Sequence, residues 1–567
     1  MFDERSSAKR DAGEGDAAHR AAPTDTDIIA LIRRLIVEDG PVLALMALLS
    51  IIALGPSVFS HVLAGDDWPH AVQRGFNIDI ALGSGRWLHA ATILFLGADL
   101  VAPPITLSLM LVLWWAGLLA VGREAGLDRS ARFVLLALFT FNPILTGFLG
   151  FETNAIAGGL SVLLCLLAGC ATMRVVAGGG VGGGGEVVGG GAPEMLRRVD
   201  VGRIALPAAL LAVGAAGFQQ FAVLMPMAAA VICAARLARG GTITFDGMAR
   251  LAVVVGITFL LGVLLYALLT SLIMALTGSA TLGSQYSLVS NYPVMEYQLV
   301  AGMRLFASAM FQFLFLPQTA IPLIAKLLVL ALIALIVLAS LRQIRVGRPL
   351  GGLMVMALIG VLLVSPWLLG FLRIGGLYYY RALAPLALTW AGIAVIALAA
   401  WPRQPGRNGA MIAAGWLILV SVLNQNAAIF VQIQNNRRDI AIAASMVERI
   451  ERLPRFAEIA RRGEAPLVVI GALALREGKH LNLPEARPPL DDADFCGLFT
   501  CGHQDLAAAL RALGTQDVVY RHTQPEEIGP STAPLATKTL RGMAPWPSDD
   551  AVRMLESGEI LIYLGKP

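Results

Sequence analysis

Two adjacent acidic residues, Asp66 and Asp67, come shortly after the first long apolar segment, which runs from Leu43 to Phe59. A charged side chain in the middle of a bilayer costs roughly 2.5–3.5 kcal/mol, so we expect both carboxylates in water or in a polar cavity. Either one could serve there as a catalytic general base, which typically contributes about 10²–10⁴ to a rate. The same pair also fits a solvated turn in which Asp caps a helix before Trp68.

Three arginines could bind a phosphate near these acids. Arg86 lies in the motif Gly85-Arg86-Trp87, and Arg373 and Arg381 flank a run of tyrosines that ends at Tyr380. A guanidinium binds a phosphate through two parallel hydrogen bonds, and Arg381 is the better of the later pair because it stands at the start of an apolar segment. Trp87 and Tyr380 are candidates for contact with a substrate. The alternative is an interfacial role, with arginines on lipid headgroups and aromatic residues in the membrane belt.

Three more polar residues interrupt apolar surroundings. Lys326 lies inside an apolar segment, where an ionisable group is usually functional, and it is a further candidate for binding the donor phosphate, although its long stem can also snorkel to the surface. Glu152 ends a very short turn and is a candidate for substrate binding or for capping a helix N-terminus. Gln219, in Phe218-Gln219-Gln220, is a second substrate-binding candidate, or a polar turn residue.

Three histidines share the region of the two acids: His61, His70 and His89. No two of them have the close spacing that is typical of a metal site. We therefore predict no metal ligands and no certain cofactor, with a divalent metal ion as the less favoured alternative.

The composition identifies the class of protein that must position these residues. The chain has 567 residues, of which 57% are hydrophobic and only 14% are charged, and its mean hydropathy is +0.71. Soluble proteins have about 25% charged residues, so this is an integral membrane protein. Taking about twenty residues per span, we predict about eleven transmembrane helices, at 41–60, 103–122, 131–148, 153–173, 203–219, 221–237, 250–275, 322–341, 350–372, 382–401 and 409–431.

Arginines stand in alternate connections between these spans, which predicts their sidedness. The basic connections contain Arg33 and Arg34; Arg123, Arg129 and Arg132; Arg174, Arg197, Arg198 and Arg203; Arg236, Arg239 and Arg250; Arg342, Arg345 and Arg348; and Arg403 and Arg407. Cytoplasmic loops carry an excess of Lys and Arg, so we expect the N-terminus inside and the C-terminus outside. All of the candidate residues above, together with the first outer loop at 61–102, then face the outer side.

Three regions flank or interrupt the predicted spans. Residues 1–40 are expected to form a cytoplasmic disordered tail followed by a surface helix at 28–37. Residues 176–200 include a glycine-rich run that we interpret as a cytoplasmic linker, because no strand precedes it as a nucleotide-binding loop would require. Residues 41–431 form the predicted transmembrane domain.

The composition changes after the last predicted span, and residues 432–567 are expected to form a small α/β domain on the outer, periplasmic side. A helix is predicted over 435–452 and another over 505–513, with strands at 467–470, 518–520 and 559–563. Cys496 and Cys501 could form a disulfide in an oxidising compartment, or remain two free thiols.

The order of these motifs resembles one family of membrane enzymes. Over about 41–450 the chain is similar to the membrane glucosyltransferases of the type-II Gtr group, which modify bacterial O-antigen and resemble the wider GT-C class. The motifs that carry the resemblance are 65–68 (Gly-Asp-Asp-Trp), 85–87, 142–143 with 151–152, 218–219, 380–382 and 435–439 (Asn-Asn-Arg-Arg-Asp). Phe218 stands where this class often has Tyr.

The resemblance implies a GT-C-like fold and transfer of a hexose, typically glucose, from a polyprenyl-phosphate carrier to a periplasmic glycan such as O-antigen lipopolysaccharide. It places the catalytic acids at Asp66 and Asp67 and the phosphate-binding arginines at Arg86 and Arg381. A bacterial inner-membrane location follows, with membrane lipids, the lipid-linked sugar and the glycan acceptor as partners. A donor-synthesising glycosyltransferase and a flippase are further candidate partners, and no nucleic acid is expected.

Two other classes of protein compete with this interpretation. A transporter or flippase of lipid-linked glycans predicts charges midway through several spans and repeat symmetry between halves, and neither is visible in the sequence. An O-antigen polymerase or ligase would also use outer arginines, but it relies on a large late loop, whereas here the acids stand in the first outer loop.

Overall fold

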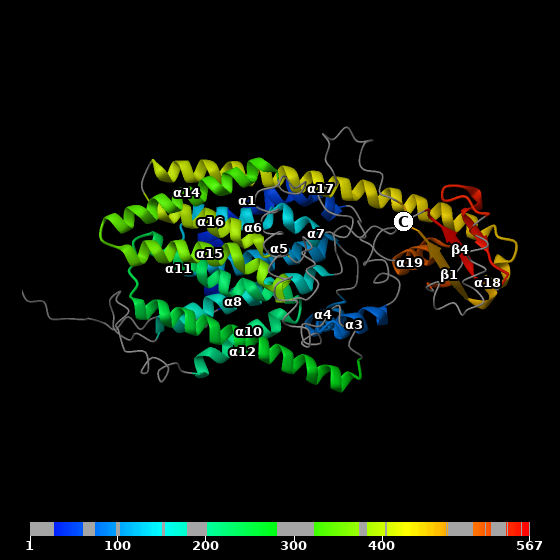
Figure 1. Cartoon of the computed structure of the whole chain (residues 1–567), viewed down its shortest axis with the longest axis horizontal. Helices are drawn as coiled ribbons and strands as arrows, with labels where there is room; N and C mark the ends of the chain where they lie inside the picture. Colours follow the sequence, from blue (N-terminus) through cyan, green and yellow to red (C-terminus); the bar gives the residue numbers. More distant parts are fainter. Residues whose placement is uncertain are drawn as a thin grey trace, which may run out of the picture.

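The structure is a computed structural model. It describes residues 28–59, 74–97, 103–149, 154–178, 201–279, 322–372, 383–402, 405–471, 473, 503–515, 518–522, 540, 542–556 and 558–565. Nearly all of this is helix, arranged as an elongated bundle with a small sheet beyond one end (Figure 1).

Within the described residues, eight helices are long and apolar enough to cross a membrane. The chain is therefore a polytopic helical membrane protein. The eight spans come from α1 (Ile28–Phe59), α5 (Pro103–Glu124), α8 (Ala155–Gly178), α11 (Leu224–Ala238) with the preceding 3-10 helix η3 (Gln219–Val223), α12 (Phe245–Thr277), α14 (Leu323–Arg345), α15 (Pro349–Leu372) and α17 (Gly406–Glu451).

The other three predicted spans coincide with shorter helices. They are α6 (Arg129–Thr140), α10 (Val201–Ala215) and α16 (Leu386–Ala400). After α6 the chain continues through a second 3-10 helix, η1 (Pro143–Leu145), and the short helix α7 (Thr146–Leu149), because Pro143 cannot donate to the helical ladder. Nearly every residue of α16 is buried, which is why its sequence is apolar on all sides.

The N-terminal part shows two features that the sequence analysis does not predict. The helix expected at 28–37 is present but is not a separate element, because α1 runs without interruption from Ile28 to Phe59 and includes Pro41. The described part of the expected outer loop at 61–102 contains two helices, α3 (Arg74–Gly83) and α4 (Trp87–Leu96). Each has ten residues, about 15 Å, too short to cross a bilayer of about 30 Å.

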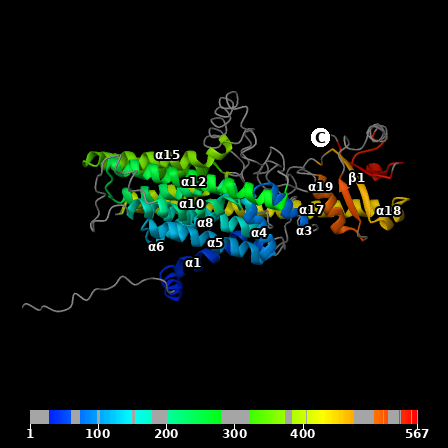
Figure 2. The ribbon, with the colours of Figure 1, turned by 90° about the horizontal axis from the view of Figure 1, so that it is seen from below.

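The helix expected over 435–452 is also not separate from the last span. Both belong to α17, whose 46 residues correspond to about 69 Å of helix. This length exceeds the hydrocarbon thickness of about 30 Å, so α17 leads out of the bundle to the sheet (Figures 1 and 2). Arg449 near its end donates to Ser548 O and to Pro547 O (2.9 Å), and its guanidinium lies 4.3 Å from the ring centroid of Trp546.

The sheet has four strands in the order β2-β1-β4-β3. β1 (Glu464–Ile470), β2 (Val519–His522) and β4 (Ile560–Tyr563) lie where strands are predicted and pair in parallel, whereas β3 (Val552–Met554), which the sequence analysis missed, pairs antiparallel with β4. The predicted helix is α19 (His503–Leu513), and a further short helix, α18 (Phe456–Arg462), precedes β1. α17, α18, α19 and the strands share one hydrophobic core.

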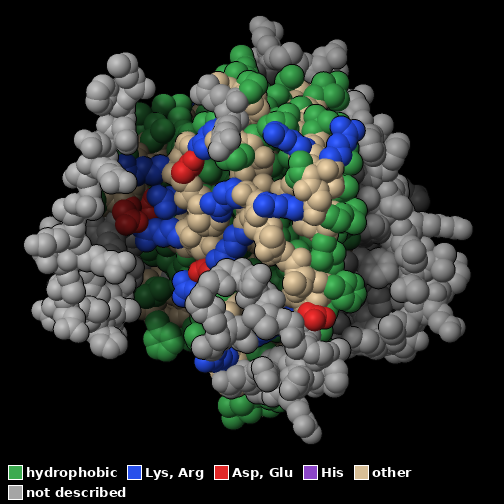
Figure 3. All heavy atoms as spheres, turned by 90° about the vertical axis from the view of Figure 1, so that its left-hand side faces the viewer, with side chains coloured by type: hydrophobic (Ala, Val, Ile, Leu, Met, Phe, Trp, Pro, Cys, Tyr) green, Lys and Arg blue, Asp and Glu red, His purple; other side chains and the backbone are tan. Residues whose placement is uncertain are grey.

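Arginines gather at the end of the bundle away from the sheet, which we call the basic end (Figure 3). Contacts join side chains from different connections there. Arg123 and Arg132 pair with Asp39; Arg174 and Arg236 pair with Glu124; Arg239 donates to carbonyls of residues 125 and 126; Arg348 donates to Gly240 O; and Arg407 pairs with Asp128. Alternate connections therefore meet at one end, as the arginine pattern predicts.

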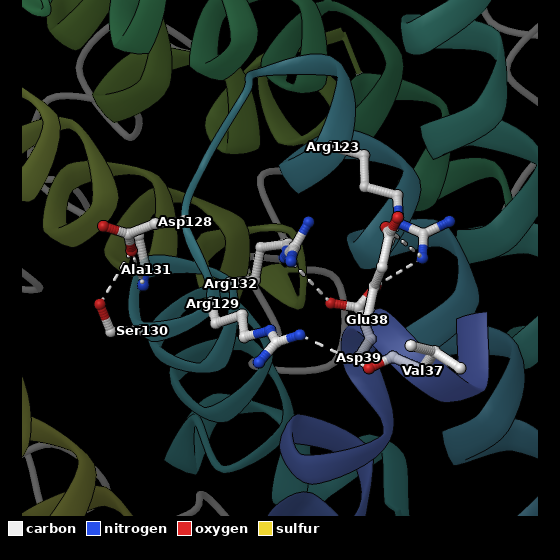
Figure 4. A network of polar contacts seen from close by, with 9 residues as sticks. All are labelled: Val37, Glu38, Asp39, Arg123, Asp128, Arg129, Ser130, Ala131 and Arg132. Carbon is white, nitrogen blue, oxygen red and sulfur yellow. Dashed lines mark hydrogen bonds and ion pairs between the residues drawn. The ribbon is translucent and has the colours of Figure 1, made fainter. Parts of the chain in front are cut away.

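The buried carboxylate of Asp39 is the centre of this end (Figure 4). Its side chain is fully buried, and it pairs with Arg123 at 2.7 Å and with Arg132 at 3.0 Å. Glu38, half exposed, adds a longer contact of 3.5 Å to Arg123. Asp39 thus ties α1 to α5 and α6, a role that the sequence analysis did not assign to it.

Candidate functional site

Four of the predicted site residues lie within the described residues: Arg86, Trp87, Gln219 and Lys326. The others lie outside them, namely Asp66, Asp67, Glu152, Arg373, Tyr380 and Arg381, together with Cys496 and Cys501. The described part of the candidate site is therefore the region around Arg86.

Arg86 stands in a tight turn between α3 and α4, the Arg86 turn (residues 84–88). Gly85 N donates to Leu82 O at 2.8 Å and Arg86 N donates to Ala81 O at 2.7 Å, which closes the C-terminus of α3. In this type of helix end the residue after the helix adopts a left-handed conformation, which favours glycine. Gly85 has φ +73°, as required.

Two side chains from distant helices hold this turn in place. Gln219 Nε2 donates to Ser84 O and to Tyr266 Oη, both at 2.8 Å, and Tyr266 Oη donates to Gly85 O at 3.2 Å. A methyl group at Gly85 would stand 2.7 Å from Tyr266 Oη. Glycine is thus required at position 85 for two reasons: the left-handed backbone conformation, and the lack of space for a methyl group beside Tyr266 of α12.

Aromatic rings support the Arg86 side chain. Its guanidinium carbon lies 5.0 Å from the ring centroid of Phe218, within the range of a cation–π interaction. The Phe218 ring in turn packs edge-on against Phe148, with centroids 5.2 Å apart, and lies 5.9 Å from the buried His89 ring. The aromatic ring of Phe218 therefore contacts the arginine that the sequence analysis predicts to bind a phosphate.

Trp87 begins α4 immediately after Arg86 and is half buried. Its indole Nε1 has no hydrogen-bond partner among the described residues. Indole nitrogens usually find a partner when they are buried, so this N–H is available to donate to a bound group.

Lys326 belongs to another part of the bundle. It is buried in the first turn of α14, which packs mainly against α15, α16 and α17. α4, in contrast, packs against α3 and α8. The structure brings Arg86, Trp87 and Gln219 together and leaves Lys326 on a different set of helices.

The Arg86 turn and the basic end lie at opposite ends of the same helices. Gln219 precedes α11 and Arg236 stands in its last turn, seventeen residues later, which corresponds to about 25 Å of helix. α3 and α4 lie at the end of the bundle that faces the sheet (Figures 1 and 2). The arrangement therefore separates one guanidinium from the many at the basic end by roughly the thickness of a membrane.

Tyr266, which completes the contacts of the turn, is not among the residues predicted from sequence. The signal for it was a hydroxyl-bearing aromatic residue within the long apolar run of α12. No group of three or more His, Cys, Asp or Glu residues that could hold a metal ion is present in the described part of the chain.

Searches of protein-family models, curated proteins and solved structures find no match for this chain.

Proposed function

We propose that the protein is a GT-C-like glycosyltransferase that moves a hexose, by its resemblance glucose, from a polyprenyl-phosphate carrier to a cell-envelope glycan such as O-antigen. The reaction takes place at the end of the bundle that contains the Arg86 turn, which we expect to face the periplasm of a bacterial inner membrane.

The observation that carries the proposal is the fixed position of Arg86. A turn that Gln219 and Tyr266 hold in place positions a guanidinium on the Phe218 ring, at the end of the bundle opposite to the arginines of the basic end. Positive charge is otherwise concentrated on the cytoplasmic side of membrane proteins. A pre-positioned guanidinium at the other side suits a phosphate that arrives on a lipid, because no reorganisation is needed when it binds.

Chain connectivity makes this end the expected place for the predicted acids. Asp39 lies at the basic end, and α1 continues for twenty residues to Phe59, about 30 Å further along the helix. The described chain resumes with α3, which leads directly into the Arg86 turn. The segment that contains Asp66 and Asp67 joins these two helix ends.

The proposed reaction is a direct displacement. Asp66 or Asp67 accepts the proton of an acceptor hydroxyl, whose oxygen attacks the anomeric carbon of the sugar. The bond between that carbon and the phosphate oxygen breaks, and the electron pair leaves with the lipid phosphate. Arg86, together with Arg381, stabilises the charge on this leaving group, which is commonly the larger electrostatic contribution. The indole N–H of Trp87 can donate to the sugar or to the phosphate.

An assay with purified protein, a polyprenyl-phosphate-linked glucose and isolated lipopolysaccharide tests this function. We expect transfer that Asp66→Asn or Asp67→Asn abolishes and that Arg86→Gln reduces at least tenfold. Arg345→Gln, at the basic end, is the matched control and should transfer at the wild-type rate. Full activity of both aspartate variants would show that the assignment is wrong.

A further inference from the structure

A cavity at the basic end lies far from the proposed reaction site. It occupies about 390 Å³ between α5, α8 and α11 and is lined by Ala120, Arg123, Glu124, Arg174 and Arg236. Three guanidinium groups and one carboxylate leave its wall with a formal excess of two positive charges. A water molecule takes up about 30 Å³ of liquid, so the cavity has room for a phosphate and part of the group that carries it.

The arginines of this wall are held by contacts within the protein. Glu124 accepts from Arg174 Nε at 3.0 Å and from Arg236 Nη2 at 2.7 Å, and its carbonyl oxygen also accepts from Arg236. Arg123 donates to Asp39 through Nε at 3.0 Å and Nη2 at 2.7 Å. These contacts orient the guanidinium groups before any ligand binds.

Several donors remain after these contacts are made. Arg174 donates only from Nε, so neither of its Nη groups has a partner among the described residues. The Nη1 groups of Arg123 and Arg236 likewise have no partner in the described part of the chain. Arg174 has a side chain that is 73% exposed, so it is accessible to a molecule that enters from outside.

We propose that this cavity binds a phosphate-bearing anion, through Arg174 with Arg123 and Arg236. Planar guanidinium groups match the geometry of phosphate oxygens and can bind them in pairs. The phosphate could belong to the headgroup of an anionic phospholipid, since basic pockets between transmembrane helices on the cytoplasmic side bind such headgroups, or to a soluble compound. The site is independent of the proposed transfer reaction, because it lies at the other end of the helices.

Thermal unfolding of the purified full chain in a neutral detergent tests the site. Short-chain phosphatidylglycerol, inorganic phosphate and short-chain phosphatidylcholine are titrated separately, since a ligand that binds the folded state raises the unfolding temperature with its concentration. We expect a saturable rise with phosphatidylglycerol, with phosphate or with both, and none with phosphatidylcholine. A response to phosphatidylglycerol alone identifies a lipid, and an equal response to inorganic phosphate identifies a soluble ligand.

Two variants decide whether the cavity is responsible. Arg174→Gln should weaken the apparent affinity about tenfold, which corresponds to about 1.4 kcal/mol. Arg345→Gln removes an exposed arginine of the same end that does not line the cavity, and it should bind like the wild type. The proposal is overturned if no phosphate compound raises the unfolding temperature, if Arg174→Gln binds as tightly as the wild type, or if Arg345→Gln loses as much affinity.

Discussion

Replacing Gly85 by alanine tests whether Tyr266 fixes the Arg86 turn. A left-handed backbone costs roughly 1–2 kcal/mol for a residue with a Cβ atom, and Gly85 has φ +73°. The new methyl group would also stand 2.7 Å from Tyr266 Oη, and overpacking of this kind typically costs about 1–3 kcal/mol. We expect Gly85→Ala to lower the free energy of unfolding by about 2–5 kcal/mol.

Tyr266→Phe removes the hydroxyl that this methyl group would meet. It also removes two hydrogen bonds, to Gly85 O and from Gln219 Nε2, which contribute about 0.5–1.5 kcal/mol each. In the double variant the clash is absent, so the two costs should not add. We expect the double variant to be more stable than the sum of the single effects predicts, by about 1–3 kcal/mol, within the range of coupling energies for residues in contact.

Unfolding by a denaturing detergent, followed by circular dichroism, measures the four free energies of this cycle. Gly278→Ala is the matched control, because Gly278 has φ +65° at the end of the same helix as Tyr266 but no atom within 4 Å of its added methyl group. Its cost should add to that of Tyr266→Phe. If Gly85→Ala and Tyr266→Phe also add to within about 0.5 kcal/mol, Tyr266 does not constrain the turn.

Three further predictions concern other parts of the molecule. Asp39→Asn leaves two arginines without their buried counter-charge, which should lower the free energy of unfolding in detergent by about 3–5 kcal/mol. Glu38 is half exposed, so Glu38→Gln should lower it by no more than about 1 kcal/mol. Equal losses for the two variants would refute the central role of Asp39. Arg86→Lys keeps the positive charge but loses the planar contact with the Phe218 ring, so the rate of transfer in the lipid-linked sugar assay should fall about tenfold. A variant as active as the wild type would show that the positive charge alone suffices. Burial, with the Glu451 carboxylate as a second cause, raises the pKa of Tyr520 from 10.0 to about 12. The neutral phenol therefore contributes fully to stability below pH 10, and this contribution is lost as the pH rises to 12. An absorbance titration of phenolate should show a step near pH 12 that is missing in Tyr520→Phe.

The main elements could be predicted from sequence because their signals are local. A run of about twenty apolar residues must form its hydrogen bonds internally in a membrane, so each predicted span contains a helix of the structure, although the span predicted at 131–148 is divided among α6, η1 and α7. The strands at Glu464–Ile470, Val519–His522 and Ile560–Tyr563 follow in the same way from β-branched and aromatic runs. The segments 28–37 and 435–452 were predicted as separate helices, and both are parts of longer helices, α1 and α17. The local pattern does not distinguish two consecutive helices from one continuous helix.

The sequence by itself determined that this is a polytopic membrane protein, where its helices lie and which connections are basic, because composition, apolar length and charge placement are properties of neighbouring residues. It also drew attention to Arg86, Trp87 and Gln219. Only the tertiary structure decided that Gln219 holds Ser84, 135 residues away along the chain, that Tyr266 holds Gly85, 181 residues away, and that Lys326 lies on other helices. Such contacts depend on which helix faces become neighbours in the bundle, and that choice is made by the packing of the whole chain.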